Sequence, residues 1–170
     1  MKTATLLSRV PLVLLTALIV ITAARCTSEA HAQGAGVTEE TVKRIINEQD
    51  YVFRATRAMP LRGRTLQLTS AYDVTVSKDS VSSWLPYFGR AYAAPMDPTR
   101  GGIQFVSTDF EYHVTDTKDG WDISIRPHDA PDVQELFLSV FGNGNATLRV
   151  TSTNRQPISF SGYVTERGRR

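Results

Sequence analysis

Cysteine is nearly absent from this chain of 170 residues, which contains only Cys26. A single cysteine excludes an intramolecular disulfide and a multi-thiolate metal site, so the folded part must rely on an apolar core. Histidine is scarce as well, at three residues. There is no Gly-x-Ser-x-Gly nucleophile motif, and Gly142 and Gly144 precede no expected helix that could hold a phosphate. We therefore expect a protein that is not an enzyme and takes no cofactor.

Neither sign of charge dominates once the N-terminal segment is set apart. The whole chain carries 19 Lys+Arg and 17 Asp+Glu, and its pI is about 8.8. Three of the basic residues and one of the acidic residues lie in residues 1–32, so residues 33–170 hold 16 of each sign. A neutral domain lacks the basic surface that binds nucleic acid, and we expect no nucleic-acid partner.

The one long apolar run lies near the N-terminus, at residues 10–24. Lys2 and Arg9 precede this run, and the small-x-small sequence Ala30-His31-Ala32 follows it. This order of basic, apolar and small residues is typical of a secretory signal peptide that is cleaved after Ala32. We expect residues 1–32 to be removed and the remainder to be exported to the periplasm or the extracellular space.

Two alternatives to this cleavage remain open. The 15 residues of the apolar run reach about 22 Å as a helix, at about 1.5 Å each, so they fall short of a hydrocarbon core of roughly 30 Å and disfavour a retained anchor. Cys26 stands where the acylated cysteine of a lipoprotein stands, but Arg25 replaces the small residue expected before it. An outer-membrane lipoprotein is the less favoured placement, with membrane contact only if Cys26 is acylated.

The residues after the signal predict one domain, because they contain no repeat and no low-complexity run. We expect a flexible lead at 33–37, a single β-rich domain at 38–166 and a frayed basic tail at 167–170. The domain begins with an amphipathic helix at 38–49, with Thr38 as its N-cap. The apolar face of this helix consists of Val42, Ile45 and Ile46.

Beyond Asp50 the apolar pattern has a period of two, which predicts antiparallel strands. The expected strands number seven or eight, and they suit a curled sheet, an open barrel or a sandwich. The segments 65–69 and 73–77 are either two strands or one bent strand, and a turn is expected at 59–63. The other unpaired strand segments are 51–56, 81–85 and 158–164.

Two Asx-Gly pairs predict hairpins with two-residue type I′ turns. The first hairpin has Asp119-Gly120 as its loop, and the second pairs Phe141 with Ala146 across Asn143-Gly144. The second register leaves an apolar stripe on the reverse face of its first strand, which the N-terminal helix is expected to cover. The residues of this stripe are Leu136, Leu138 and Val140.

A possible metal site lies on one strand face, at Asp109, Glu111 and His113. Alternate side chains of a strand project together, and two carboxylates with an imidazole suit a divalent cation. In the expected register, however, Arg126 stands opposite His113 and would repel a cation. We therefore interpret this face as a solvated polar surface and expect no metal.

An aromatic segment at 84–95 joins two strands, and its prolines and Gly89 prevent a regular ladder or helix. Its rings either line the mouth of the curled sheet and hold an apolar or sugar-like ligand, or close the end of the sheet as a plug. Phe88, which has no polar group, is the expected plug. The candidate ligand-binding residues are Trp84, Tyr87, Arg90 and Tyr92.

This segment and several later motifs resemble a bacterial family of domains of unknown function, family 4251. The matching motifs are Leu85-Pro86-Tyr87-Phe88-Gly89-Arg90-Ala91-Tyr92, Gly101-Gly102-Ile103-Gln104-Phe105, Gly144-Asn145-Ala146, Ser152-Thr153-Asn154-Arg155-Gln156 and Ile158-Ser159-Phe160-Ser161-Gly162. The resemblance covers nearly all of the chain beyond the signal. It implies an exported envelope protein of Gram-negative bacteria, which in some members is a lipoprotein, and it implies no activity.

The functional hypothesis from the sequence is a non-enzymatic binding module of the envelope for a small apolar or amphipathic ligand. The alternative is a structural or protein-interaction module, in which an exposed sheet edge or the aromatic segment contacts another envelope protein.

We predict that the mature protein begins at Gln33, because signal peptidase requires the small residues Ala30 and Ala32 before its cleavage site. N-terminal sequencing of the protein isolated from the cells that export it tests this prediction. A diacylglyceryl group on Cys26 would contradict it and would place the protein on a membrane surface.

Overall fold

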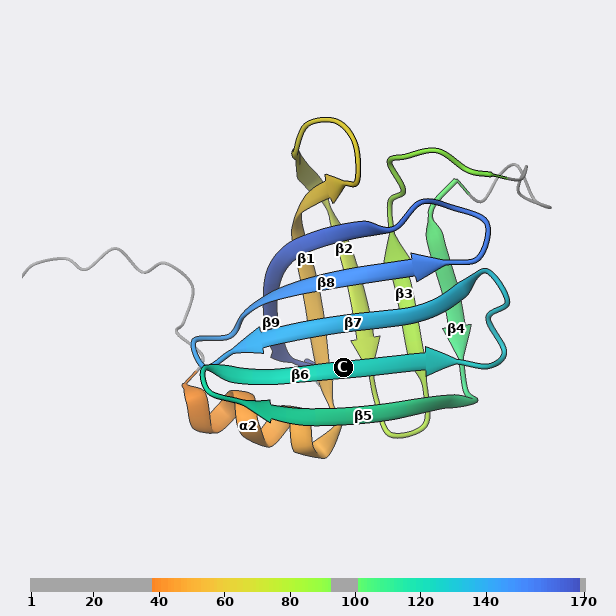
Figure 1. Ribbon diagram of the computed structural model, residues 1–170. Helices are drawn as coiled ribbons and strands as arrows, with labels where there is room; N and C mark the ends of the chain where they lie inside the picture. The colour runs from red at the N-terminus through yellow and green to blue at the C-terminus, as the bar shows by residue number, and fades with distance from the viewer. Residues whose placement is uncertain (1–37, 93–100, 169–170) are drawn as a thin grey trace, which may run out of the picture. The chain divides into compact units, whose positions relative to one another are not determined.

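The computed structural model describes residues 38–92 and 101–168, which form one helix and a nine-stranded antiparallel sheet (Figure 1). The sheet order is β4-β3-β2-β1-β9-β8-β7-β6-β5. The elements are α2 (Glu39–Glu48), β1 (Tyr51–Pro60), β2 (Leu66–Val76), β3 (Val81–Leu85), β4 (Ile103–Ser107), β5 (Phe110–Thr117), β6 (Gly120–Pro127), β7 (Val133–Phe141), β8 (Asn145–Ser152) and β9 (Ile158–Glu166). The expected mainly β fold with one N-terminal helix is confirmed, although the described strands number nine rather than seven or eight.

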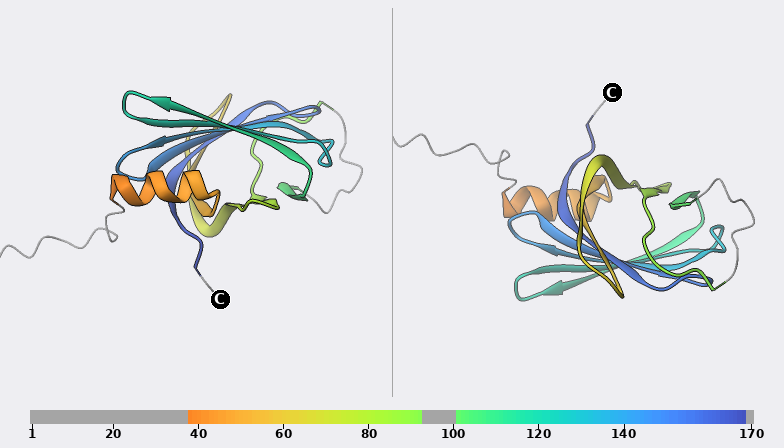
Figure 2. Two further views of the ribbon diagram at one scale, coloured as in Figure 1. Left: turned by 90° about the horizontal axis from the view of Figure 1, so that it is seen from below. Right: turned by 90° about the horizontal axis from the view of Figure 1, so that it is seen from above.

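The sheet curls into a nearly closed barrel (Figure 2). Strands β1 to β4 form one run of neighbouring strands, β5 to β8 form a second, and β9 joins them by pairing with both β1 and β8. The two end strands, β4 and β5, follow one another in the chain and are separated only by Thr108 and Asp109. Among the described residues they form no ladder with each other, so the barrel keeps a gap at this point.

The helix has the expected apolar face and N-cap. The Thr38 hydroxyl accepts a hydrogen bond from the Thr41 N–H at 3.3 Å, and the helix ends at Gln49, whose φ of 51° is left-handed. Its three apolar residues are fully buried in the single core that the inner sheet face also builds. The Tyr112 hydroxyl on β5 donates to the Ile46 carbonyl at 3.3 Å and attaches the helix to the edge of the sheet.

The first expected hairpin has the correct faces but a register that is wrong by two residues. Thr117 pairs with Gly120, so the loop is Lys118-Asp119 rather than Asp119-Gly120. A shift of two preserves both faces of a strand, because side chains alternate with a period of two. Gly120 is needed for close approach: a Cβ there would lie 2.0 Å from the Val140 carbonyl oxygen on β7.

The second expected hairpin is wrong by one residue, which exchanges the two faces of β7. Val140, not Phe141, pairs with Ala146, and Gly144 adopts a φ of 82° in a loop that is one residue longer than a two-residue turn. Its N–H bonds to the Phe141 carbonyl at 2.8 Å, as in a type I turn followed by a left-handed glycine. The apolar stripe therefore faces the core together with β8, and Phe141 faces outward.

One further expectation changes, and one open alternative is decided. Strand β1 continues to Pro60, so the turn lies after residue 60 and not around it, and the segments 65–69 and 73–77 form the single strand β2. Arg167, the first residue of the expected tail, places its Nε 2.9 Å from Asp50 Oδ1.

The expected signal peptide and lead, residues 1–37, lie outside the described residues, as do residues 169–170. No helix within the described ranges has the length and hydropathy needed to cross a membrane.

The backbones of β1 and β9 approach each other closely at Gly162. The register of β1 shifts between Ala55 and Arg57 against both of its neighbours, as at a β-bulge. Opposite Ala55 stands Gly162, where a Cβ would lie 1.9 Å from the Arg54 carbonyl oxygen. The missing side chain lets the two backbones approach beside the register shift of β1.

We predict that Gly162→Ala destabilises the protein by about 1–3 kcal/mol or more, because the new methyl group must displace the backbone of β1. Gly101→Ala is the matched control, since a Cβ at Gly101 meets no atom within 4 Å. Chemical denaturation measures both free energies of unfolding. Equal stability of the two variants would contradict the close approach of β1 and β9.

A second prediction concerns alkaline stability. Burial raises the pKa of Tyr112 to about 12, and burial also raises the pKa of Tyr51, whose hydroxyl lies 3.3 Å from that of Tyr112. The unfolded chain ionises its tyrosines near pH 10. Stability should therefore be full below about pH 10 and fall as the pH rises toward about 12, because the folded state keeps its phenols protonated.

The Tyr112→Phe variant tests this account, since it keeps the ring and removes one titrating group. Its loss of stability above about pH 10 should be shallower than that of the natural protein. Below that pH it should be less stable by about 1 kcal/mol, because the hydrogen bond to Ile46 is absent. Superimposable pH profiles in thermal melts would show that Tyr112 does not couple ionisation to folding.

Candidate functional site

The aromatic segment after β3 lies against the loop that joins β8 to β9. Ala91 forms an isolated antiparallel bridge with Arg155. The Tyr92 N–H donates to the Asn154 carbonyl at 2.7 Å, and the Gln156 N–H donates to the Arg90 carbonyl at 3.1 Å. These backbone bonds hold residues 90–92 to a loop more than 60 positions later in the chain. The rest of the expected segment, from residue 93, lies outside the described residues.

The Tyr87 side chain also contacts both of these segments. Its hydroxyl donates to the Arg90 carbonyl at 2.8 Å and lies 3.2 Å from the Gln156 carbonyl oxygen. The ring is half-buried against the core, and burial raises the pKa of its hydroxyl. Gly89 provides the space, because a Cβ there would lie 2.8 Å from the Tyr87 hydroxyl. The Tyr87 hydroxyl therefore links the aromatic segment to the β8–β9 loop, which is a structural role.

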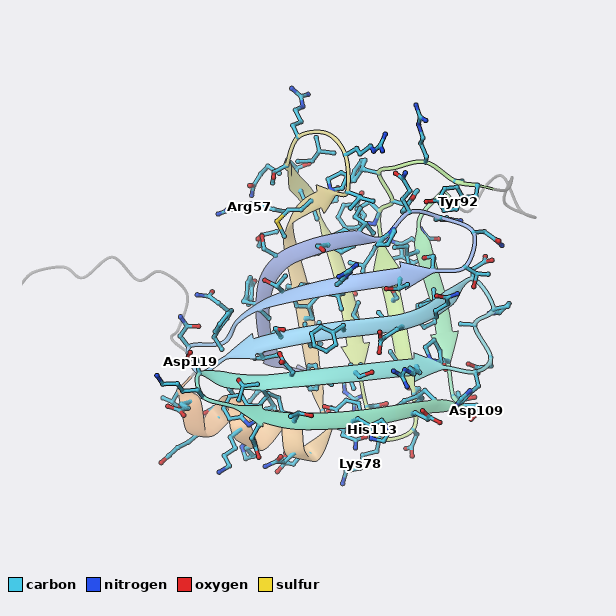
Figure 3. The ribbon with its side chains drawn as sticks, viewed as in Figure 1. Arg57, Lys78, Tyr92, Asp109, His113 and Asp119 are labelled. Atoms are coloured by element: carbon cyan, nitrogen blue, oxygen red, sulfur yellow. The ribbon has the colours of Figure 1, made fainter. Side chains whose placement is uncertain are left out.

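The four candidate binding residues do not form one cluster. Arg90 and Tyr92 are exposed beside Tyr87, and 70% of Tyr92 is open to solvent (Figure 3). Trp84 points to the outer face of β3, opposite Asp73 and Gln104, and is 56% exposed. Phe88, the expected plug, is half-buried and packs against the core.

A pocket of about 300 Å³ lies at the gap of the barrel, and none of the four candidates lines it. One wall is formed by residues 102–106, consecutive positions that run along β4, and the facing wall by residues 129–133 of the β6–β7 connection and the start of β7. Ser152 and Arg155 complete the lining. Because β4 is an end strand of the sheet, its outer edge presents backbone N–H and C=O groups toward this space.

Arg155 is a charged residue of the pocket lining whose orientation two contacts constrain. Its guanidinium lies over the Tyr87 ring, 5.2 Å from the ring centroid, and its Nη1 donates to the Gly102 carbonyl at 2.9 Å. The arginine thus joins three segments distant in sequence: the aromatic segment, the start of β4 and the β8–β9 loop. Stacking on a ring and a directed hydrogen bond hold the guanidinium in one orientation.

The opposite wall of the pocket is tied to the corner between β4 and β5. The Asp129 carboxylate accepts a hydrogen bond from the Thr108 N–H at 2.9 Å, and the His128 N–H donates to the Asp109 carbonyl at 2.8 Å. These bonds fix residues 128–129 beside the short connection that crosses the gap. The pocket is therefore bounded by two walls that the backbone itself positions.

The possible metal site does not assemble. Figure 3 shows Asp109 at the end of β5 and apart from His113, which lies along that strand. Carboxylate oxygens of Glu111 lie 4.0 Å from His113 Nε2 and 3.7 Å from His128 Nε2. Arg126 stands opposite Glu111 and not opposite His113, because the hairpin register differs by two from the expected one. Within residues 38–92 and 101–168, no group of three His, Cys, Asp or Glu side chains is arranged to hold a metal ion.

Arg155 was not among the residues that the sequence singled out for binding. It stands in the motif Ser152-Thr153-Asn154-Arg155-Gln156, but nothing local indicates that it meets Tyr87 and Gly102. The signal in the sequence is that Tyr87 and Arg155 each stand in a motif of the resembled family, and this does not specify that the two side chains meet.

Comparison with known proteins places the chain in a family. The model of the family described as "Domain of unknown function (DUF4251)" matches residues 34–164. A crystal structure of a DUF4251 family protein from Bacteroides eggerthii is similar with a TM-score of 0.58 and 19% identity, over 77% of this chain and 89% of that chain. No curated protein matches the chain. Because the family match covers well over half of the sequence, this chain belongs to the DUF4251 family.

Proposed function

We propose that this protein is an exported, non-enzymatic binding module that holds a small amphipathic ligand in the pocket at the barrel gap. The observation that carries the proposal is the position of Arg155, a guanidinium oriented by the Tyr87 ring and the Gly102 carbonyl at the lining of a concave site. A charged group held in place before a ligand arrives loses little freedom on binding. Export is supported by the signal sequence at residues 1–32.

The size and lining of the pocket support a small ligand. Its volume of about 300 Å³ lies at the lower end of the range for small-molecule sites, roughly 300–1,000 Å³. Phe105 and Val106 offer apolar surface, and Ser152 and Arg155 offer polar groups. Such a division suits a ligand with an apolar body and a polar head.

The charged residues of the pocket lining indicate which polar group the ligand carries. A guanidinium has five N–H donors, and Arg155 uses one of them for Gly102, so the group suits an oxygen acceptor such as a carboxylate or a sulfonate. Asp129 and Asp132 lie on the facing wall and disfavour a ligand with several negative charges. The best fit is therefore one acceptor group carried by a compact apolar body.

The second candidate function is a protein-interaction module of the envelope, and the free edge of β4 favours it. An extended segment of a partner could pair with this end strand and run along the same pocket. Native mass spectrometry of the protein isolated from its own cells separates the two functions. A small molecule that remains bound supports the ligand-binding module, and a bound polypeptide supports the interaction module.

We predict that Arg155→Gln weakens binding of 8-anilinonaphthalene-1-sulfonate, an amphipathic fluorophore with one sulfonate, by roughly tenfold or more, because the charge-assisted hydrogen bond is lost. Arg149→Gln is the matched control: Arg149 is exposed on β8, pairs with Phe137 and Ser159, and does not line the pocket. Fluorescence titration of the folded variants, checked by circular dichroism, measures both dissociation constants. Equal binding by the two variants would contradict a site at Arg155.

A further inference from the structure

A row of four side chains crosses the outer face of the barrel, away from the lining of the Arg155 pocket. Tyr163 on β9 pairs with Arg54 on β1, Arg54 pairs with Asp73 on β2, and Asp73 pairs with Trp84 on β3. Directly paired residues of adjacent strands project from the same face, so the four side chains share one surface. Three strand spacings of about 4.8 Å separate the two aromatic residues, a span of roughly 14 Å.

The two aromatic side chains at the ends of the row are exposed to solvent. Trp84 is 56% exposed and Tyr163 is 43% exposed, whereas the other tryptophan, Trp121, is only 6% exposed. Large rings normally contribute to the core, so exposed rings held on strands at both ends of a row indicate a surface available for stacking.

Between the rings lies an ion pair that is itself accessible. Arg54 Nη1 is 3.4 Å from Asp73 Oδ2, and both side chains are partly exposed. The pair presents N–H donors and carboxylate acceptors side by side, yet it adds no net charge to the surface. It can therefore hydrogen-bond a neutral polar ligand without selecting one sign of charge.

The row borders a hollow with a second wall. Arg54 and Asp73 line it together with Val52 and Thr75 of the neighbouring row, and residues 167–168 at the end of the chain form the opposite side. The hollow is thus lined by side chains of β1 and β2 and by residues 167–168.

We propose that this outer row binds an uncharged saccharide chain. Rings that lie flat against a ligand match the C–H faces of sugar rings, and the Arg54–Asp73 pair matches their hydroxyl groups, which both donate and accept hydrogen bonds. The hollow also has two basic and two acidic side chains, Arg54, Arg167, Asp50 and Asp73, so neither an anion nor a cation finds a surface of opposite sign. A span of roughly 14 Å suits a chain of sugars better than a single ring.

This saccharide site does not depend on the pocket at Arg155. No residue lines both sites: the row lies on β9, β1, β2 and β3, its hollow adds Asp50 and residues 167–168, and the pocket opens at the β4 edge. Either proposal can fail without the other.

The test uses native-gel affinity electrophoresis of the folded protein in four neutral polysaccharides: dextran, yeast mannan, laminarin and galactomannan. We expect at least one of them to retard the natural protein. Trp84→Ala and Tyr163→Ala should each weaken the retarding interaction by roughly tenfold, the effect typical of an aromatic anchor. Phe137→Ala is the matched control, because Phe137 is also an exposed ring on the outer sheet face, on β7 and outside the row.

Tryptophan fluorescence provides a second readout on the same protein. Binding over the row should change the emission of exposed Trp84 and leave that of buried Trp121 unchanged, so the change should vanish in Trp84→Phe. The proposal is overturned if none of the four polysaccharides retards the protein, if retardation needs an acidic polymer such as polygalacturonate, or if Phe137→Ala weakens binding as much as Trp84→Ala.

Discussion

The close approach of β1 and β9 at Gly162 is the contact on which the rest of the molecule depends. The backbones meet where a Cβ would lie 1.9 Å from the Arg54 carbonyl oxygen, beside the register shift of β1. Through this pairing, β1–β4 and β5–β8 belong to one sheet whose inner faces share one core, which α2 joins through its three buried residues. The same pairing also brings the two end strands to the same side, where Thr108 and Asp109 cross the gap and the Arg155 pocket opens.

Much of the fold could be predicted because its determinants are local. The N-cap at Thr38 and the apolar spacing of α2 are properties of adjacent residues, and the structure places that helix within one residue of the expected bounds. The registers of the two hairpins were harder to predict, because a change of one residue in loop length shifts the strand pairing. A two-residue error at Lys118-Asp119 left the faces of β5 and β6 unchanged, whereas a one-residue error at Gly144 exchanged the faces of β7 and put Phe141 outside.

The candidate site was less predictable because its contacts join distant parts of the chain. Tyr87 was expected at a mouth, but its hydroxyl bonds to the carbonyl of Arg90 and lies near that of Gln156, and its ring supports Arg155. No local pattern predicts that Arg155 reaches Gly102. The outer row poses the same difficulty: Trp84 alternates with Ser83 and Leu85, and only the pairing with Asp73 and Arg54 shows that it shares a face with Tyr163.

The barrel has a preformed pocket at the edge of β4, and we propose that this pocket binds a ligand. Mapping of backbone amide chemical shifts by NMR during titration with 8-anilinonaphthalene-1-sulfonate tests that claim most directly. We predict that the perturbed amides cluster at residues 102–106, 129–133 and 152–155, the segments that line the pocket or adjoin Arg155. Perturbations centred on the outer faces of β7 and β8, or scattered over the whole sheet, would contradict the account.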